Sequence, residues 1–474
     1  DATPSPSWAL YVPKVLAVWA LTLGLLAVGV AFSAAYQTAQ GYTAYEWGVY
    51  AGTLVLQYAL PAMMVAVLSV TIQVLSPNKY AGMLIFVLYI VASLTMAELG
   101  FEHHLWRFSE GPEAIYSDLN GFGHFLAPLL WYSLYWSGAT IVLLVLGFGL
   151  WRRGAVVRLR ERLPRLATTM DRPGAATALL GLVTFATAGA YLFHTTRVTN
   201  EFLTTDQRYD RYADYERTLK PFDALPTPAV TAVTVAIDIF PAERRIHASG
   251  SYTVQNRTDK PLEQVLIGAA PANALTIDAE GLGEARRFAG LNTALYAFDP
   301  PLEPGEARRL GFTVERDNPG FTDGSEDNAV AANGTFINNQ QLLPRLGYVS
   351  LYQLVDRHER KKRGLPPPER LPALEDAAAQ HRTVLGADAQ FAMLDITVST
   401  DEDQLAIAPG YLEREWVEGG RRHFRYVMDA PSLNYFAVQS ARYAVARDAH
   451  EGVAIEVYHH PEHHRNVARM IEAV

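Results

Sequence analysis

The sequence predicts an α + β protein of several domains, in which polytopic transmembrane helices are followed by an antiparallel β-sandwich. Two observations predict this class. Only ten of the 89 Asp, Glu, Lys and Arg residues of the 474-residue chain lie in the first 150 positions. From Pro228 onward apolar residues recur with a period of two, whereas the earlier apolar runs approach the ~20 residues of a membrane span. This split excludes a single uniform globular domain.

The composition also excludes several kinds of site. The chain has no cysteine, so it has neither a disulfide framework nor a thiolate metal site. Its formal net charge of −9 argues against nucleic acid as a partner, because phosphate binding needs a clustered basic face.

Five apolar segments define the predicted transmembrane domain, residues 1–196. A spanning helix needs about 20 predominantly apolar residues, because only a helix satisfies its own backbone hydrogen bonds in hydrocarbon. The segments are 15–36, 50–75, 81–97, 126–150 and 175–193. The third is the shortest, and Pro61 predicts a kink in the second. The lipid bilayer is therefore the first expected partner.

A basic loop sets the predicted orientation. Residues 151–173 hold seven arginines against one Glu and one Asp, which places this loop in the cytoplasm. Lys14 and Lys79 then also fall inside, and the acidic loop 98–125 falls outside. Everything after residue 196 is expected outside the cytoplasm. The residues that determine this topology are Arg152, Arg153, Arg158, Arg160, Arg162, Arg165 and Arg172.

The acidic loop begins with four titratable side chains, Glu98, Glu102, His103 and His104. They could form a metal or proton site, since ionisable groups within a membrane are costly. The simpler interpretation, which we prefer from sequence, is that they lie just past a helix end in the wet interface.

After residue 196 the long apolar runs end, and polar and alternating segments follow. Residues 197–227 are polar and predict a helical or irregular stalk. Residues 228–458 contain many short alternating runs separated by turns, a pattern typical of an antiparallel sandwich. Within them, residues 356–385 combine a charge run with three consecutive prolines and predict an exposed insertion.

The order of the runs 231–240, 246–256, 391–399, 422–428 and 434–443 resembles the N-terminal β-domain of aminopeptidase-N-like (gluzincin) zinc metallopeptidases. Residues 459–474, which open with His459-His460-Pro461-Glu462, resemble the start of the linker to the catalytic domain in that family. The helical part, with its 116–125 stretch, resembles the second permease half of an ABC type-two exporter.

Together these resemblances imply a fragment of a longer bacterial protein in the inner membrane, with a cytoplasmic N-terminus and a periplasmic β-domain. They also imply a cytoplasmic ATPase subunit and a second permease half as partners, and a peptide as a possible substrate. The catalytic motif of the family is missing. It needs His-Glu-x-x-His on a helix, but His358-Glu359 and His450-Glu451 both lack a second histidine at that spacing.

The Gly-x-Met-Glu-Asn segment of the family is missing as well. We therefore expect no cofactor in this chain, zinc in the catalytic domain of the parent, and no peptidase activity from these residues alone.

Four histidines, His459, His460, His463 and His464, are a weaker metal candidate. Pro461 disfavours helical geometry at His460, so a solvent-exposed linker is the preferred interpretation.

By position in the family, one amide or carboxylate of the β-domain helps bind the substrate amine. The resemblance places that group within Asn338, Asn339, Gln340 and Gln341, and the alternative is an ordinary polar turn. The leading functional hypothesis is a permease-like membrane protein with a periplasmic aminopeptidase-like β-domain. A non-enzymatic, membrane-anchored binding or sensing β-domain is the alternative, and a structural anchor for a partner is a third.

Overall fold

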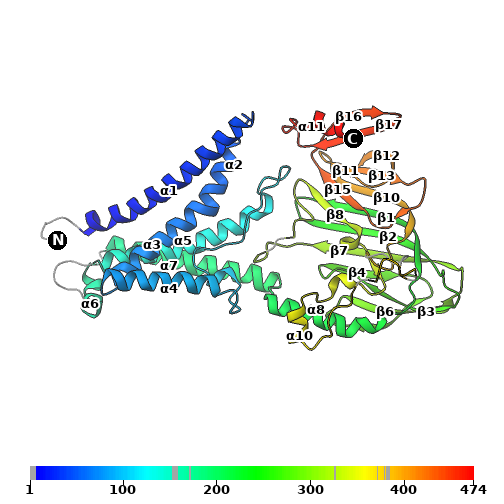
Figure 1. Cartoon of the computed structure of the whole chain (residues 1–474), viewed down its shortest axis with the longest axis horizontal. Helices are drawn as coiled ribbons and strands as arrows, with labels where there is room; N and C mark the ends of the chain where they lie inside the picture. Colours follow the sequence, from blue (N-terminus) through cyan, green and yellow to red (C-terminus); the bar gives the residue numbers. More distant parts are fainter. Residues whose placement is uncertain are drawn as a thin grey trace. The chain divides into compact units, whose positions relative to one another are not determined.

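The computed structural model describes residues 7–151, 159–169, 172–324, 327–370, 372–377, 379 and 385–474. The chain divides into two compact units (Figure 1). The first, called the helical unit here, consists of Asp1–Ile115, His124–Thr205 and Gly320–Glu326. The second, the β-rich unit, consists of Tyr116–Gly123, Asp206–Pro319 and Asp327–Val474. Each unit therefore includes a short segment from the other half of the sequence.

Among its described residues, the helical unit contains four helices that are long and apolar enough to cross a membrane, over Ala9–Ala39, Trp47–Leu75, Gly123–Gly149 and Arg172–Thr199. Its elements in chain order are α1 (Ser7–Ala39), α2 (Trp47–Gly52), the π-helical turn η1 (Thr53–Ala59), α3 (Leu60–Leu75), α4 (Lys79–Thr95), the 3-10 turns η2 (His104–Trp106) and η3 (Gly123–Phe125), α5 (Leu126–Gly149), α6 (Leu159–Thr169), α7 (Arg172–Phe193) and the π-helical turn η4 (His194–Thr199).

All five segments predicted to span are helical, but α4 differs from the other four. It has 17 residues, and at a rise of about 1.5 Å per residue it is about 25 Å long, slightly less than the ~30 Å hydrocarbon core. Pro61 lies in the first turn of α3, directly after η1. The irregularity expected at this proline thus falls in the preceding turn.

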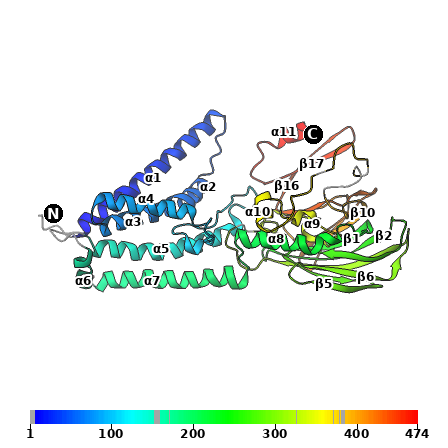
Figure 2. The ribbon, with the colours of Figure 1, turned by 60° about the horizontal axis from the view of Figure 1, so that its bottom comes forward.

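Helices α5 and α7 pack with their backbones in close contact and run side by side (Figure 2). Gly138 and Gly181 make this possible. A Cβ atom on Gly138 would lie 2.6 Å from the Phe185 nitrogen, and one on Gly181 would lie 2.9 Å from the Gly138 carbonyl oxygen. Small residues at helix interfaces are typical of membrane bundles, where close packing replaces the hydrophobic effect between helices.

The β-rich unit is built on an eight-stranded sheet of order β12-β13-β10-β1-β2-β7-β4, with β14 paired to β10. A four-stranded sheet, β5-β6-β3-β9, shares one hydrophobic core with it, and smaller sheets are formed by β11-β15-β8 and β16-β17. The strands are β1 (Ala229–Phe240), β2 (Arg245–Gln255), β3 (Leu262–Gly268), β4 (Asn273–Asp278), β5 (Leu282–Phe288), β6 (Thr293–Leu302), β7 (Ala307–Asp317), β8 (Thr335–Asn338), β9 (Arg345–Leu346), β10 (Phe391–Asp401), β11 (Leu405–Ile407), β12 (Tyr411–Glu418), β13 (Arg421–Val427), β14 (Ser432–Leu433), β15 (Ala437–Ala441), β16 (Ala444–His450) and β17 (Val453–His459).

The large sheet is mixed, which corrects the prediction of a purely antiparallel sandwich. Strand β10 runs parallel to β1, with Val235 opposite Ile396, whereas β1 and β2 are antiparallel. A parallel pair needs a long crossover connection, and the 150 residues between these strands supply one. The alternating pattern of β1 shows which face of the strand is buried, but it cannot show the direction of a neighbour so distant in sequence.

Residues 206–227, assigned to a stalk from the sequence, belong to the β-rich unit. Helix α8 (Thr205–Leu219) packs Tyr215 and Leu219 against Leu266 of β3 and Leu295 of β6, and the 3-10 turn η5 (Lys220–Phe222) follows it. The insertion 356–385 also contains an ordered helix, α10 (Arg357–Lys362). The remaining elements are α9 (Asn339–Leu342), the 3-10 turn η6 (Ser350–Tyr352) and α11 (Val467–Ala473).

Candidate functional site

The four amides proposed from the family resemblance lie together at the start of α9, and each bonds within the protein. Asn338 caps the helix by accepting from the Gln341 N–H at 2.9 Å. Asn339 is buried and donates to Asn434 Oδ1 at 3.1 Å, and Gln340 donates to the Leu385 carbonyl at 2.8 Å. These contacts stabilise the turn before β9, and binding of a substrate amine by these residues stays a prediction.

Of the arginines in the basic loop, Arg152, Arg153 and Arg158 lie outside the described residues, as does the side chain of Arg165. Arg162 is buried. Its guanidinium donates to the Val74 carbonyl at 2.8 Å and to the Leu150 carbonyl at 2.6 Å. These carbonyls belong to the C-terminal ends of α3 and α5, where a cation is favourable. Arg162 therefore has a structural role in addition to its expected effect on topology.

The histidines near the C-terminal end do not gather around a common point. His463 forms an ion pair with Asp118, and the His460 and His463 rings are 4.4 Å apart. Among the described residues there is no group of three or more His, Asp or Glu side chains placed to hold a metal ion. The segment Tyr116–Gly123, on which the sequence-based expectation of a permease partly depended, belongs to the β-rich unit, where Asn333 donates to the Leu119 carbonyl at 2.5 Å.

The most unusual polar cluster lies in the helical unit, around the Asp323 carboxylate. Asp323 follows Phe321, which is buried in a hydrophobic cluster with Met64, Tyr132 and Leu192. Asn200 donates to the Phe321 carbonyl at 3.1 Å. The buried Phe321 side chain and the hydrogen bond from Asn200 thus hold this short segment among the helices.

Asp323 has a fully buried side chain that accepts hydrogen bonds from three donors. His104 donates from Nδ1 to Oδ1 at 2.9 Å and from its backbone N–H to Oδ2 at 3.1 Å. The Tyr132 hydroxyl on α5 donates to Oδ1. Bonds of this kind to a charged acceptor are stronger than those between neutral groups, and they offset the cost of burying the carboxylate.

His103 lies beside the same carboxylate, but the hydrogen-bond partners of its two ring nitrogens are those of a neutral imidazole. The Thr196 hydroxyl donates to the Leu192 carbonyl at 2.7 Å, so it accepts from His103 Nε2 at 3.0 Å. His103 Nδ1 accepts from the Leu105 N–H at 3.2 Å. With its only proton on Nε2, the ring cannot donate to Asp323 Oδ2, which lies 3.4 Å from Nδ1.

The electrostatics agree with these hydrogen bonds. Burial lowers the pKa of His103 to about 4; the charge of Asp323 opposes the shift, while those of Arg197 and His104 add to it. Burial alone would raise the pKa of Asp323, but the hydrogen bond and charge of His104 and the hydrogen bond from Tyr132 lower it below its ordinary value. At neutral pH the site therefore holds an ionised Asp323 beside a neutral His103. From the sequence we preferred to place the four titratable residues at the start of the acidic loop in the wet interface. This is wrong for His103, which is 1% exposed.

The other two members of the sequence cluster do not reach this site. Glu98 is exposed, and Glu102 accepts from the Thr205 N–H and hydroxyl at 2.9 Å, at the start of α8. Asp323 itself was missed, because it lies 219 residues from His104. Its sequence surroundings give no local signal of burial.

A cavity of about 300 Å³ adjoins the cluster at Tyr132. It is lined by η1 and α3, by the loop with Glu110 and Glu113, and by α5. Gln57 lines it and donates to the Ala114 carbonyl at 2.8 Å. The carboxylates and hydroxyls on its wall suit a cation or a hydrogen-bond donor, and Tyr132 connects this wall to Asp323.

No protein-family model matches the chain, and a comparison with curated proteins finds no match. Among solved structures, an M1 zinc metallopeptidase from Deinococcus radiodurans, crystallised as a mutant with a Tyr-Ser-Ala substrate, is 15% identical, with a TM-score of 0.30 over 52% of each chain. A second crystal structure of an M1 zinc metallopeptidase from that organism is 14% identical, with a TM-score of 0.30 over 52% of this chain and 49% of its own. The chain thus spans about half the length of these metallopeptidases, and at this TM-score the likeness carries no argument.

Proposed function

We propose that the chain is an integral membrane protein that presents its β-rich unit on the extracytoplasmic side. One observation carries this proposal, the apolar surface of the helices. Leu21, Val28 and Phe32 of α1 are 66%, 67% and 73% exposed, and the other long helices are similarly apolar. Water does not tolerate a continuous apolar surface of this kind, whereas a bilayer does.

The orientation follows from the basic residues and depends on α4. With α4 in the membrane, the loop at Lys79 and the loop that holds α6 lie on one side, and the acidic residues 98–113 lie on the other. Without α4 as a span, Lys79 and the acidic loop would share a side. The separation of the basic from the acidic loops favours five spans and an extracytoplasmic β-rich unit.

In its finer form, the proposal makes the β-rich unit the N-terminal domain of an aminopeptidase-like zinc metallopeptidase in the bacterial periplasm. The order of the β runs and the residues 459–474 support it through their resemblance to that family. Zinc and the hydrolysis of peptides then belong to a catalytic domain that residues 1–474 do not contain. The β-rich unit itself acts as a structural or peptide-contacting module.

Transport is the second candidate function, and the cavity beside Tyr132 favours it. Buried ionisable groups next to a polar cavity in a helical membrane unit often mark the route of an ion or substrate. This candidate requires a cytoplasmic ATPase and a second permease half as partners. Recovery of an ATPase with the protein in mild detergent would support it, and its consistent absence would count against it.

The lack of native cysteine makes the orientation directly measurable. Single-cysteine variants at the exposed positions Asp259 and Arg160, Asp259→Cys and Arg160→Cys, are treated with a membrane-impermeant maleimide in spheroplasts and after permeabilisation. We expect Asp259→Cys to react in both preparations and Arg160→Cys only after permeabilisation. The unmodified chain provides the background, and the opposite labelling pattern would invert the proposed topology.

A third variant tests whether α4 spans. Pro77→Cys replaces an exposed residue just before α4. We expect it to behave like Arg160→Cys, with no labelling before permeabilisation. Labelling in intact spheroplasts would place this loop outside and remove α4 from the set of spans.

A further inference from the structure

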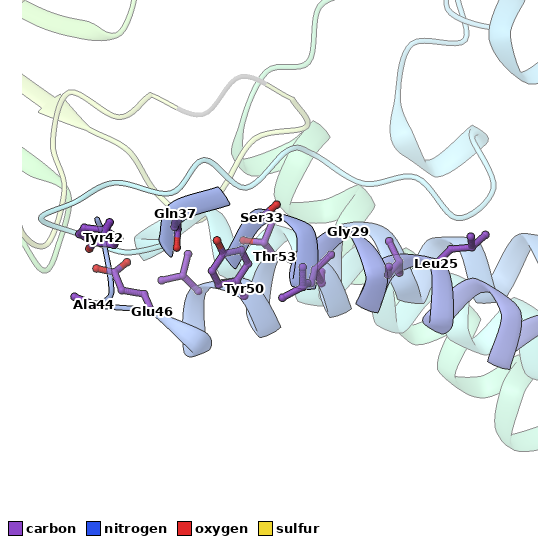
Figure 3. Close-up of a pocket in the computed structure, with 13 residues that line it drawn as sticks. Leu25, Gly29, Ser33, Gln37, Tyr42, Ala44, Glu46, Tyr50 and Thr53 are labelled. Carbon is purple, nitrogen blue, oxygen red and sulfur yellow. The ribbon is translucent and has the colours of Figure 1, made fainter. Parts of the chain in front are cut away.

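A second pocket in the helical unit, of about 440 Å³, lies between α1 and the α2–η1 segment. Its lining changes from apolar to polar along α1. Figure 3 shows Leu25 and Gly29 toward one end, Ser33, Gln37, Tyr50 and Thr53 between, and Tyr42, Ala44 and Glu46 at the other end. From Leu25 to Gln37, α1 rises about 18 Å, close to the ~15 Å thickness of one leaflet of hydrocarbon.

The polar end of the pocket lies at a membrane surface in the proposed topology. Residues 40–46 join the spans Ala9–Ala39 and Trp47–Leu75, so they must lie outside the hydrocarbon. Tyr45, Trp47 and Tyr50 form a series of ring contacts there, with centroids 5.1 and 5.9 Å apart. Aromatic residues of this kind gather at the depth of lipid headgroups.

The polar end offers acceptors rather than cations. Glu46 contributes a carboxylate, and the pocket has no Lys or Arg among its thirteen lining residues. Gln37 Oε1 is buried and has no hydrogen-bond partner among the described residues. A buried acceptor without a donor is costly, so the site favours a ligand that brings N–H groups and positive charge.

We propose that this pocket binds one phospholipid with a primary ammonium headgroup, of the phosphatidylethanolamine type. The ammonium donates to Gln37 Oε1 and to the Glu46 carboxylate, and one acyl chain lies along α1 past Gly29 toward Leu25. A quaternary choline headgroup has no N–H to donate, and an anionic headgroup brings further negative charge close to the Glu46 carboxylate. The proposal rests on the membrane location proposed above and goes beyond it.

Two kinds of variant separate the headgroup from the acyl chain. Gln37→Leu and Glu46→Gln each remove one ammonium contact. Gln40→Leu is the matched control, since this exposed glutamine at the end of α1 does not line the pocket. Gly29→Phe fills the apolar part of the pocket. A Cβ on Gly29 meets no atom within 4 Å, so a side chain can begin there without a backbone clash, and its ring would occupy the pocket that Gly29 lines.

The test is native mass spectrometry of the full chain in mild detergent, titrated with phosphatidylethanolamine, phosphatidylcholine or phosphatidylglycerol of identical acyl chains. We expect one tightly bound phosphatidylethanolamine, with an affinity about tenfold above that for the other two lipids, as one charge-assisted hydrogen bond would give. Gln37→Leu and Glu46→Gln should remove this preference, Gln40→Leu should retain it, and Gly29→Phe should abolish the bound lipid. Circular dichroism and gel filtration confirm that each variant is folded.

Three results would overturn the proposal. They are equal binding of phosphatidylcholine, an unchanged preference in Glu46→Gln, and equally tight binding of glycerophosphoethanolamine, which has the headgroup but no acyl chains. Each of them leaves the cysteine-labelling result unaffected, so a failure of the lipid site is distinguishable from a failure of the proposed topology.

Discussion

Arg360 of α10 and Glu216 of α8 form a buried ion pair with two parallel hydrogen bonds, of 2.6 and 2.8 Å. The Arg360 side chain is 3% exposed and that of Glu216 is 7% exposed. Arg360 also donates to the carbonyls of Leu354 and Pro366, at 2.5 and 2.7 Å. The predicted exposed insertion is therefore attached to the β-rich unit through one of its most buried charges.

Replacing Arg360 alone should destabilise the β-rich unit strongly. Arg360→Met leaves the Glu216 carboxylate buried without its partner, which costs about 3–5 kcal/mol. The double variant Arg360→Met, Glu216→Leu should recover most of that loss, since it leaves no unpaired charge. Thermal unfolding followed by circular dichroism measures both. Arg447→Ala, which removes an exposed pair with Glu456, is the control and should change stability by less than about 1 kcal/mol.

Enlarging Gly138 should separate α5 from α7. Gly138→Leu places a side chain where even a Cβ lies 2.6 Å from the Phe185 backbone nitrogen. Because backbone cannot yield as a side chain does, we expect a loss of about 1–3 kcal/mol or more, seen as a lower Tm and aggregation in detergent. Gly24→Leu on α1, where a Cβ meets nothing within 4 Å, should leave both measurements unchanged. Equal effects at the two positions would refute close packing at Gly138.

Acidification should destabilise the helical unit through His103. Its pKa is about 4 in the folded protein and 6.5 ordinarily, so the unfolded chain binds the proton more tightly. The stability contributed by the neutral ring is fully present above about pH 6.5 and is lost as the pH falls toward 4, by about 2 kcal/mol at pH 5. The charged groups that face the ring are Asp323, His104 and Arg197, and Asp323 titrates below this range.

The measurement compares the protein with His103→Gln at pH 7.5 and pH 5. Glutamine keeps a donor toward Thr196 and has no proton to gain in this range. Between pH 7.5 and pH 5, the Tm of the unmodified protein should fall further than the Tm of the variant. An equal fall of Tm in both would show that His103 is not the titrating group. Histidines away from Asp323 contribute equally to both proteins, so the difference between the two proteins is assigned to this site.

The sequence predicted what depends on local pattern and missed what depends on distant contacts. The apolar runs around α1, α3, α5 and α7 are visible within windows of about 20 residues, because membrane insertion is a property of each helix by itself. Alternation identified β1 and β2 in the same way. The parallel pairing of β1 with β10 has no such local signature, because it depends on chain that lies far away in sequence.

The candidate site shows the same limit more sharply. His103 and His104 were singled out as costly if buried, but burial follows from Asp323 and Phe321, which come from between β7 and β8. No local sequence pattern connects the loop with His103 and His104 to the segment with Phe321 and Asp323. Arg360 is a similar case, since its place in a charge run indicates an exposed residue, whereas Glu216 makes a buried position possible.

If zinc and peptide hydrolysis belong to a separate catalytic domain, as proposed above, purified residues 1–474 should release no amino acid from peptides. Its sequence contains no His-Glu-x-x-His, and its described residues contain no three-ligand metal group. Hydrolysis by the zinc metallopeptidases that the sequence resembles needs a zinc ion held by two histidines and a further ligand. The purified chain, incubated with aminoacyl-nitroanilides and micromolar zinc, should match the buffer rate, with an active M1 metallopeptidase as the positive control. Zinc-dependent turnover removed by a chelator would refute this expectation.

Removing the Asp323 carboxylate should release the segment around it. In Asp323→Ala, the His104 N–H and the Tyr132 hydroxyl lose their acceptor in a buried site, and each unpaired group costs about 1–3 kcal/mol. The equilibrium population of molecules in which this segment is open should therefore rise at least about tenfold. The rate of cleavage by proteinase K should rise by the same factor, since proteolysis follows the population of the open form. Mass spectrometry of the fragments should place the new cuts near Phe321. Asp317→Ala, at an exposed aspartate six residues earlier in the sequence, should be cleaved at the original rate, and equal cleavage of the two variants would mean that Asp323 does not hold the segment.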